Sequence, residues 1–121
     1  MLKNSNSDVR LKEPKGKKRS SKWRSVRKAF LKKHPRCAVC GGNVKVEVHH
    51  IIPFFLRPDL ELDRGNLITL CEGKKTINCH CAIGHGCNYK DFNPDVVKDA
   101  EHFHDLITNW QIVELEKTNG R

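Results

Sequence analysis

Apolar residues are spaced periodically through most of the 121-residue chain, but not in its first 19 residues. Residues 1–19 are polar and charged without periodicity, which predicts a disordered arm. From residue 20 onward, apolar side chains recur at positions i, i+3, i+7 and i+8, namely Trp23, Val26, Phe30 and Leu31. This spacing predicts a one-sided helix over residues 20–34, which Pro35 ends.

Apolar and charged residues alternate strictly in the segment after the predicted helix. Val44, Val46 and Val48 alternate with two charged residues, which predicts a half-buried strand running into His49 and His50. Adjacent side chains on a strand leave on opposite faces, so the two histidines can have different roles. Residues 66–71 predict a second strand, antiparallel to the first. The loop between them, residues 53–65, carries apolar side chains expected to cover a small core: Phe54, Phe55, Leu56, Leu60 and Leu62.

The last third of the chain predicts two helical segments. One begins within residues 79–84 and is kept short by Gly84 and Gly86. The other begins at Asn93-Pro94, a capping residue followed by a proline at the first helical position. Its apolar face predicts a helix from Pro94 to about Thr108, and the residues beyond either extend it or fray. We therefore assign residues 93–112 to a C-terminal helix.

Charge is distributed unevenly along the chain. The net charge is +9, and residues 1–33 hold 13 Lys and Arg against two acidic residues, which leaves 10 against 12 for residues 34–121. A basic arm of this kind indicates a polyanionic partner such as nucleic acid, although a solubilising tail gives the same pattern.

The six cysteines allow either disulfides or metal binding. The N-terminus has no apolar run of signal-peptide length, and no 18 apolar residues run together, so we expect a cytoplasmic protein without a membrane segment. Reduced thiols in C-x-x-C pairs usually bind metal. Cys37-Ala-Val-Cys40-Gly-Gly accordingly indicates a zinc knuckle, in which glycines permit the turn that directs both sulfurs to one ion.

Several short motifs occur in a fixed order that resembles the HNH endonuclease family. They are C-x-x-C at 37–40, V-H-H-I-x-P at 48–53, N-L-x-x-L-C at 66–71, C-H at 79–80, and G-H followed by D-F-N-P within 84–94. The resemblance implies an α+β fold with a small ββα-metal core over residues 36–92, stabilised by a structural zinc and flanked by the N- and C-terminal helices. With the basic arm set apart, residues 20–121 form one nuclease domain.

The same resemblance implies roles for individual residues of these motifs. His50 would be the general base, and His49 and His80 would hold one catalytic divalent ion, with His85 as a third ligand. Asn66 would orient the loop that directs His50. Histidine ligands accept Mg²⁺, Mn²⁺, Ni²⁺ or Zn²⁺, so the residues do not select the metal. The implied reaction is phosphodiester hydrolysis that leaves a 5′-phosphate and a 3′-hydroxyl.

The structural zinc has a preferred ligand set and two alternatives. Our first choice is Cys37, Cys40, Cys71 and Cys79. Cys81 and Cys87 depart from the family pattern, and they either replace Cys79 or are buried thiols.

The resulting hypothesis is an HNH DNA endonuclease or nickase with little sequence specificity of its own. By analogy with similar proteins, it would be phage-encoded, act in the host cytoplasm and work with terminase or other packaging proteins. Two alternatives are a non-catalytic, zinc-stabilised DNA-binding module of the same fold and a zinc-binding RNA-associated protein.

Overall fold

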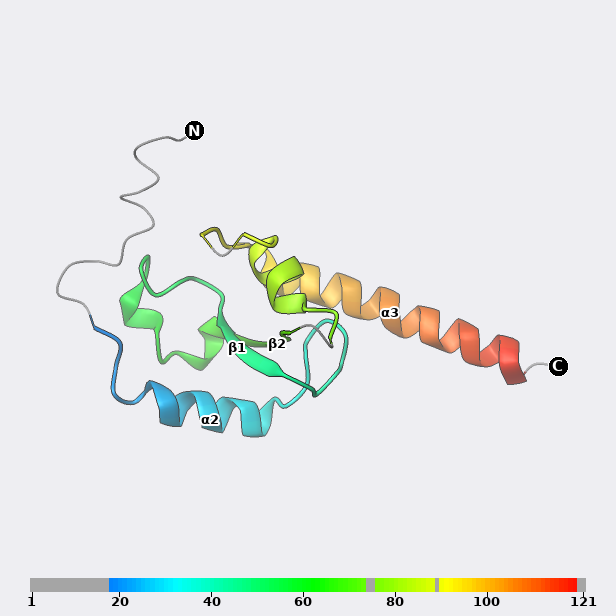
Figure 1. Cartoon of the computed structure of the whole chain (residues 1–121), viewed down its shortest axis with the longest axis horizontal. Coiled ribbons are helices and arrows are strands. Elements are labelled where there is room, and N and C mark those ends of the chain that lie inside the picture. The colour runs from blue at the N-terminus through cyan, green and yellow to red at the C-terminus, as the bar shows by residue number, and fades with distance from the viewer. Residues whose placement is uncertain (1–17, 74–75, 89, 120–121) are drawn as a thin grey trace, which may run out of the picture.

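The chain folds around a two-stranded sheet, as Figure 1 shows for the computed structural model, which describes residues 18–73, 76–88 and 90–119. Most of the arm expected over residues 1–19 lies outside the described residues. The elements, in chain order, are α2 (Trp23–Lys33), β1 (Val46–His50), the short 3-10 turns η1 (Pro58–Leu60) and η2 (Arg64–Asn66), β2 (Leu67–Cys71), the π-helix η3 (His80–His85) and α3 (Val96–Asn119). This α+β arrangement confirms the predicted fold class.

β1 and β2 pair antiparallel, as predicted, with Val46 opposite Cys71 and His50 opposite Leu67. β1 begins two residues later than the valine alternation suggests. Lys45 has a φ of 53°, outside the extended region, and the Val44 side chain before it is 57% exposed. Only the last part of the alternating run is therefore strand.

α2 occupies residues 23–33 rather than 20–34, because the residues before it are held by other contacts. The Ser20 backbone N–H donates to the buried carboxylate of Glu61 at 3.0 Å, and the Ser20 hydroxyl accepts from the Lys22 N–H. These bonds fix the entry to α2 against the loop that follows β1. Trp23, at the first turn of α2, thereby reaches the end of the hairpin.

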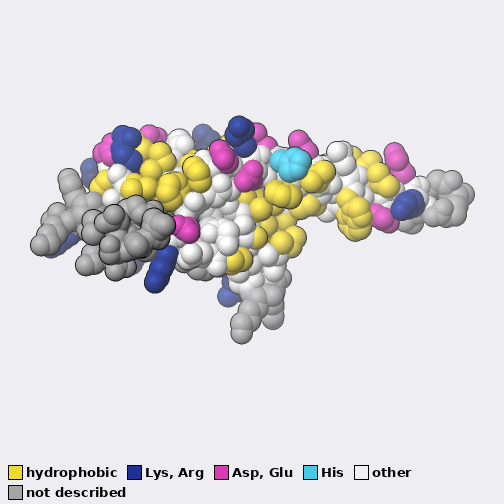
Figure 2. Space-filling view, turned by 90° about the horizontal axis from the view of Figure 1, so that it is seen from above, with side chains coloured by type: hydrophobic (Ala, Val, Ile, Leu, Met, Phe, Trp, Pro, Cys, Tyr) yellow, Lys and Arg dark blue, Asp and Glu magenta, His cyan; other side chains and the backbone are white. Residues whose placement is uncertain are grey.

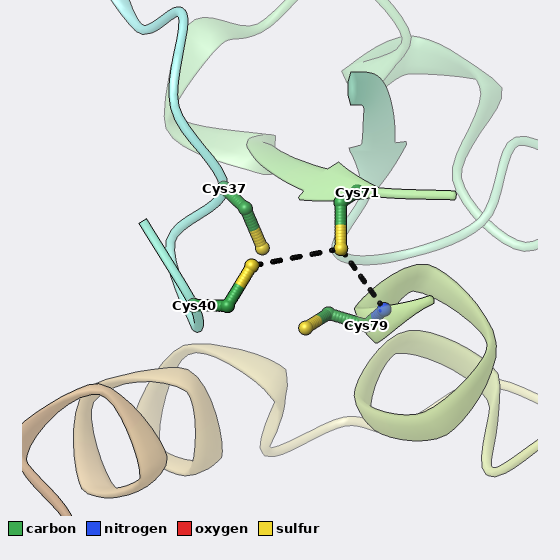
Figure 3. Close-up of side chains that lie close together, drawn as sticks. All are labelled: Cys37, Cys40, Cys71 and Cys79. Atoms are coloured by element: carbon green, nitrogen blue, oxygen red, sulfur yellow. Dashed lines mark hydrogen bonds between the residues drawn. The ribbon is translucent and has the colours of Figure 1, made fainter. Parts of the chain in front are cut away.

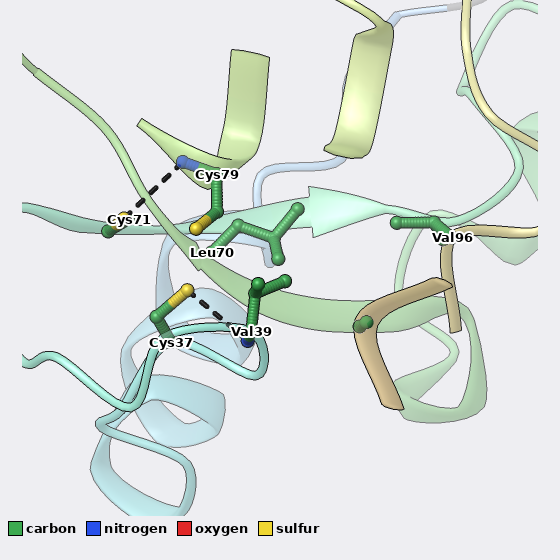
Figure 4. Close-up of a cluster of buried hydrophobic side chains, with 7 residues drawn as sticks. Cys37, Val39, Leu70, Cys71, Cys79 and Val96 are labelled. Carbon is green, nitrogen blue, oxygen red and sulfur yellow. Dashed lines mark hydrogen bonds between the residues drawn. The ribbon is translucent and has the colours of Figure 1, made fainter. Parts of the chain in front are cut away.

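A small core joins the N-terminal knuckle, the hairpin and α3 (Figure 4). Its members are Cys37, Val39, Leu70, Cys71, Cys79, Val96 and Ala100. Of the loop residues expected to cover the core, Phe54 is buried, whereas the prediction was wrong for Leu56, which is 45% exposed. So few apolar side chains bury little surface, and a domain of this size benefits from a metal crosslink.

α3 is longer than predicted and begins at Val96, two residues after Pro94. The Asn93 side chain accepts from the Asp95 N–H, so Pro94 and Asp95 form a turn that leads into the helix. At about 1.5 Å per residue, its 24 residues span about 36 Å. Figure 1 shows the C-terminal half of α3 projecting away from the rest of the protein. Among the described residues, none of the helices combines the length and apolar character that crossing a membrane requires.

Candidate active site and zinc site

The four cysteines chosen from the sequence converge on one point (Figure 3). The sulfurs of Cys37, Cys40, Cys71 and Cys79 all lie within 4.8 Å of one another. The Cys40 and Cys71 sulfurs are 3.7 Å apart, close to the separation of about 3.8 Å expected for two thiolates 2.3 Å from a tetrahedral zinc. The donor set and its spacing therefore suggest a structural zinc site.

Local backbone geometry directs these sulfurs inward. Gly41 adopts a φ of 77°, which turns the knuckle and brings the Cys37 N–H within 2.7 Å of the Gly42 carbonyl oxygen. Backbone N–H groups of Val39 and Cys79 donate to the sulfurs of Cys37 and Cys71, each at 3.4 Å. A hydrogen bond from the Cys79 thiol lowers the pKa of Cys37 to about 4. This shift favours the thiolate form of Cys37, which is the form that binds metal.

Cys81 and Cys87 take neither of the roles expected from the sequence. They form a disulfide with each other, outside the four-cysteine cluster. Gly86 and Cys87 both have a φ of 60°, and the Cys87 N–H donates to the Cys81 carbonyl oxygen at 2.6 Å. This left-handed ending of η3 turns the chain back on itself and brings the two cysteines together.

A second cluster consists of three histidines. The Nε2 atom of His80 lies 3.1 Å from His49 Nδ1 and 3.2 Å from His85 Nε2. Nitrogens bound about 2.05 Å from a tetrahedral ion would be about 3.3 Å apart, so the spacing fits one metal ion. The structure thus brings together the three histidines that the sequence singled out as metal ligands.

Outer hydrogen bonds direct the Nε2 atoms of His80 and His85 toward the cluster. His85 Nδ1 bonds to the Asp91 carbonyl oxygen at 2.8 Å, and His80 Nδ1 bonds to the Glu72 carboxylate. Both partners accept hydrogen bonds, so each Nδ1 donates outward and each Nε2 is directed toward the cluster. Burial lowers the pKa of His85 and, with the neighbouring histidines, that of His49 to about 3. The convergence of these three ring nitrogens suggests a cation site.

The π-helical form of η3 makes this cluster possible. Residues five apart in an α-helix point about 140° away from each other, whereas a π-helix places them on one side. His80 and His85 are five apart, and η3 covers both. A Cβ on Gly84 would lie 3.3 Å from ring atoms of both His49 and His80, so glycine permits their close approach.

Glu72 is a functional candidate that the sequence interpretation missed. It directly follows β2, and its carboxylate bonds to His80 Nδ1, which fixes the ring with Nε2 toward the cluster. Carboxylates behind metal-binding histidines typically change metal affinity by 10- to 100-fold. We expect Glu72→Gln to weaken divalent-ion binding by about tenfold while zinc content stays constant. Isothermal titration with Mn²⁺ measures this, and affinity equal to that of the wild type would exclude the role.

His50 lies beside this cluster but contacts different elements. Its ring packs on Trp23 of α2 with centroids 4.5 Å apart, and its Nε2 lies 3.0 Å from the Glu61 carbonyl oxygen. Because that oxygen can only accept, Nε2 carries the proton and Nδ1 keeps its lone pair. Burial lowers the pKa of His50, so the ring is neutral at pH 7. An uncharged imidazole with a free lone pair is suited to accept a proton.

Asn66 connects the two ends of the loop that positions His50. Its side chain accepts from the Ile52 N–H at 2.8 Å and donates to the Ile52 carbonyl oxygen at 3.0 Å. It also donates to Leu60, next to Glu61, at 3.4 Å. Asn66 is buried and its side chain bonds to residues of this loop, so it supports the loop that holds the His50 ring.

A hollow of about 180 Å³ opens over the three clustered histidines and His50. It is lined by Arg19, Val48, His49, His50, Pro53, Phe54, His80 and His85. The Arg19 guanidinium lies over the Phe54 ring at 4.2 Å and 4.0 Å from the Glu61 carboxylate. Arg19 was expected to belong to the arm, and no motif distinguished it there. Its position brings a positive charge to the hollow, where a phosphate would enter.

A β-hairpin and a helix that bring histidines to one point, with a four-cysteine cluster behind them, define a ββα-metal nuclease fold. Residues 37–85 match the family model of the HNH endonuclease, from the first clustered cysteine to the third clustered histidine. The chain therefore carries an HNH endonuclease domain, and the members of this family are phosphodiester hydrolases. The search of curated proteins and the search of solved structures gave no match.

Proposed function

We propose that this protein is a divalent-metal-dependent DNA endonuclease or nickase that uses His50 as its general base. The observation that carries the proposal is the placement of two kinds of histidine around one hollow. Three histidine rings converge with metal-ligand spacing, while His50 lies beside them with its own proton directed away. Phosphodiester hydrolysis requires both a cation at the phosphate and a base at the attacking water.

In the proposed reaction, His50 Nδ1 removes a proton from the water that attacks phosphorus. The Glu61 carbonyl oxygen stabilises the resulting imidazolium, because it accepts from the Nε2–H on the opposite side of the ring. Trp23 restricts rotation of the same ring. Asn66 acts indirectly by holding the loop from which the Glu61 carbonyl projects.

The divalent ion would be held by His49, His80 and His85. When bound, it neutralises charge on the scissile phosphate and on the leaving 3′ oxygen. Glu72 keeps His80 oriented toward the ion. Arg19, on the same hollow, is placed to bind a neighbouring phosphate oxygen. Three histidine ligands from the protein would leave room at the ion for substrate.

The chemistry of the product ends tests this assignment. End-labelled duplex DNA incubated with the zinc-loaded protein and Mg²⁺ or Mn²⁺ should give fragments with 5′-phosphate and 3′-hydroxyl ends. DNA ligase should therefore rejoin nicks without prior kinase treatment, and EDTA should prevent cleavage. Tight DNA binding without cleavage under all of these conditions would instead establish the non-catalytic DNA-binding module.

We further expect affinity for DNA to depend strongly on the basic arm and on salt. Deleting residues 1–17 removes five Lys and Arg but leaves Arg19 in the hollow. Each lost phosphate contact lowers the salt slope of log K by about 0.9, so the deletion should weaken binding most at low salt and make the affinity less dependent on salt. Fluorescence anisotropy across a salt series measures this. The same affinity and slope for both proteins would exclude the arm from DNA binding.

We expect weak sequence preference from this protein alone. Among the described residues, no separate domain stands beside the hairpin and helices to read base edges. Phosphate contacts position a protein on DNA without selecting a sequence. Any specificity in a DNA-packaging complex would then belong to a partner protein.

A further inference from the structure

Exposed apolar side chains are concentrated on α3. Ten large hydrophobic residues are exposed in the described part of the chain, and seven of them belong to this helix: Val97, Phe103, Leu106, Trp110, Ile112, Val113 and Leu115. Figure 2 shows hydrophobic side chains along the projecting end of the molecule. Contiguous apolar surface on a projecting helix marks an interaction site.

Four of these residues form a regular stripe. Phe103, Leu106, Trp110 and Val113 follow one another at spacings of three, four and three, and are 40%, 51%, 62% and 46% exposed. The spacing places them on one face, as in the seam of a coiled coil. The core-facing side of α3, with Val96 and Ala100, is a neighbouring but different face. The helix therefore has one covered and one uncovered apolar face.

We propose that a second copy of this chain covers the stripe, with the two α3 helices antiparallel. The stripe is symmetric about residue 108, five positions from each of its ends. In an antiparallel pair centred there, Phe103 lies opposite Val113 of the second copy, and Leu106 lies opposite Trp110. Each layer pairs a larger side chain with a smaller one, which is the complementarity that close packing requires.

Charge favours the same alignment. Asp99 and Lys117 continue the stripe at its two ends, and each is nine residues from position 108. An antiparallel pair places Asp99 of each copy opposite Lys117 of the other, whereas a parallel pair places like charges together. Figure 1 shows the folded body at the N-terminal end of α3, so antiparallel helices also keep the two bodies at opposite ends.

The composition of α3 argues against nucleic acid as the occupant. The helix carries five acidic residues and only two basic ones, Lys98 and Lys117. A polyanion would be repelled by this surface. When a second copy is aligned antiparallel, the stripe is complementary to itself in side-chain size and in charge. A second copy of the chain is therefore a suitable occupant.

Sedimentation velocity of the full-length, zinc-loaded chain tests the proposal independently of any nuclease activity. Over roughly 1–100 µM, the wild type should shift from monomer to dimer. Trp110→Glu should weaken dimerisation by about 100-fold, because it places a charge in a central layer. Leu115→Glu is the matched control, because Leu115 is 61% exposed but lies on another side of the helix. Zinc content and circular dichroism confirm that the variants fold.

The charge pair supplies a test of orientation. Lys117→Glu should weaken the dimer by about tenfold, and Lys117→Arg should preserve it. In a parallel pair, the same exchange would replace one repulsion with another and leave the affinity unchanged. A wild type that stays monomeric throughout would overturn the proposal. So would equal loss of the dimer in Trp110→Glu and Leu115→Glu, and an unchanged dimer in Lys117→Glu would overturn the antiparallel alignment.

Discussion

Replacing Cys71 with serine is expected to unfold the domain rather than merely weaken it. Cys71 is almost completely buried and belongs both to the sulfur cluster and to the core. A structural zinc in a small domain contributes about 10–16 kcal/mol, which equals or exceeds the net stability of most domains, about 5–15 kcal/mol. Losing one of four ligands should therefore remove the cooperative thermal transition, together with most of the bound zinc.

The disulfide provides the control for this variant. Cys81→Ser combined with Cys87→Ser removes two cysteines outside the cluster and opens only a short loop. The cost of opening it should be about 2 kcal/mol, and zinc content should stay at one per chain. Differential scanning calorimetry with metal analysis distinguishes the two variants. A folded, cooperative Cys71→Ser protein without zinc would contradict the structural role of the cluster.

Replacing His50 with alanine should reduce the cleavage rate by about 10²- to 10⁴-fold, the usual contribution of a general base. The ring contributes little to the core, since it packs mainly on Trp23 at the rim of the hollow. Zinc content, folding and Mn²⁺ binding by the three clustered histidines should therefore persist. Single-turnover cleavage of labelled DNA, with saturating Mn²⁺, measures the effect on the chemical step.

His34→Ala is a suitable control for His50→Ala. His34 is also a histidine that packs against an aromatic ring, Phe30, but it lies outside the hollow. Its backbone carbonyl oxygen accepts from Thr69, and alanine keeps that bond. Its cleavage rate should equal that of the wild type. A similar loss of activity in both variants would indicate a general effect on folding instead of a lost base.

The clustering of the four cysteines could be predicted from the sequence because metal binding restricts residue type and local spacing. A C-x-x-C pair followed by glycines has few alternative uses, and the structure places Cys37 and Cys40 in the sulfur cluster as expected. Alternation likewise predicted the hairpin, with a boundary error at Lys45, whose positive φ no propensity indicates. Motif spacing and apolar alternation therefore predicted the local structure of these segments well.

Features that depend on tertiary contacts could not be predicted in the same way. The family resemblance placed His80 and His85 at one site, but it did not predict the π-helix that brings them together, and an α-helix over residues 80–85 would separate them. Glu72 gained its role from a contact between segments, and nothing in its sequence neighbourhood distinguished it from other acidic residues. Similarly, the pairing of Cys81 with Cys87 depends on a left-handed turn at Gly86.

We propose that one small domain separates a structural metal site from a catalytic one and cleaves DNA with His50. This proposal is tested most directly by relaxation of supercoiled plasmid by the wild type and His50→Ala at equal zinc content, each with EDTA, Mg²⁺ or Mn²⁺. The wild type should nick or linearise the plasmid only with added Mg²⁺ or Mn²⁺, and His50→Ala should leave it supercoiled. Equal cleavage by the two proteins, or none by a zinc-loaded wild type that binds the plasmid, would contradict the account.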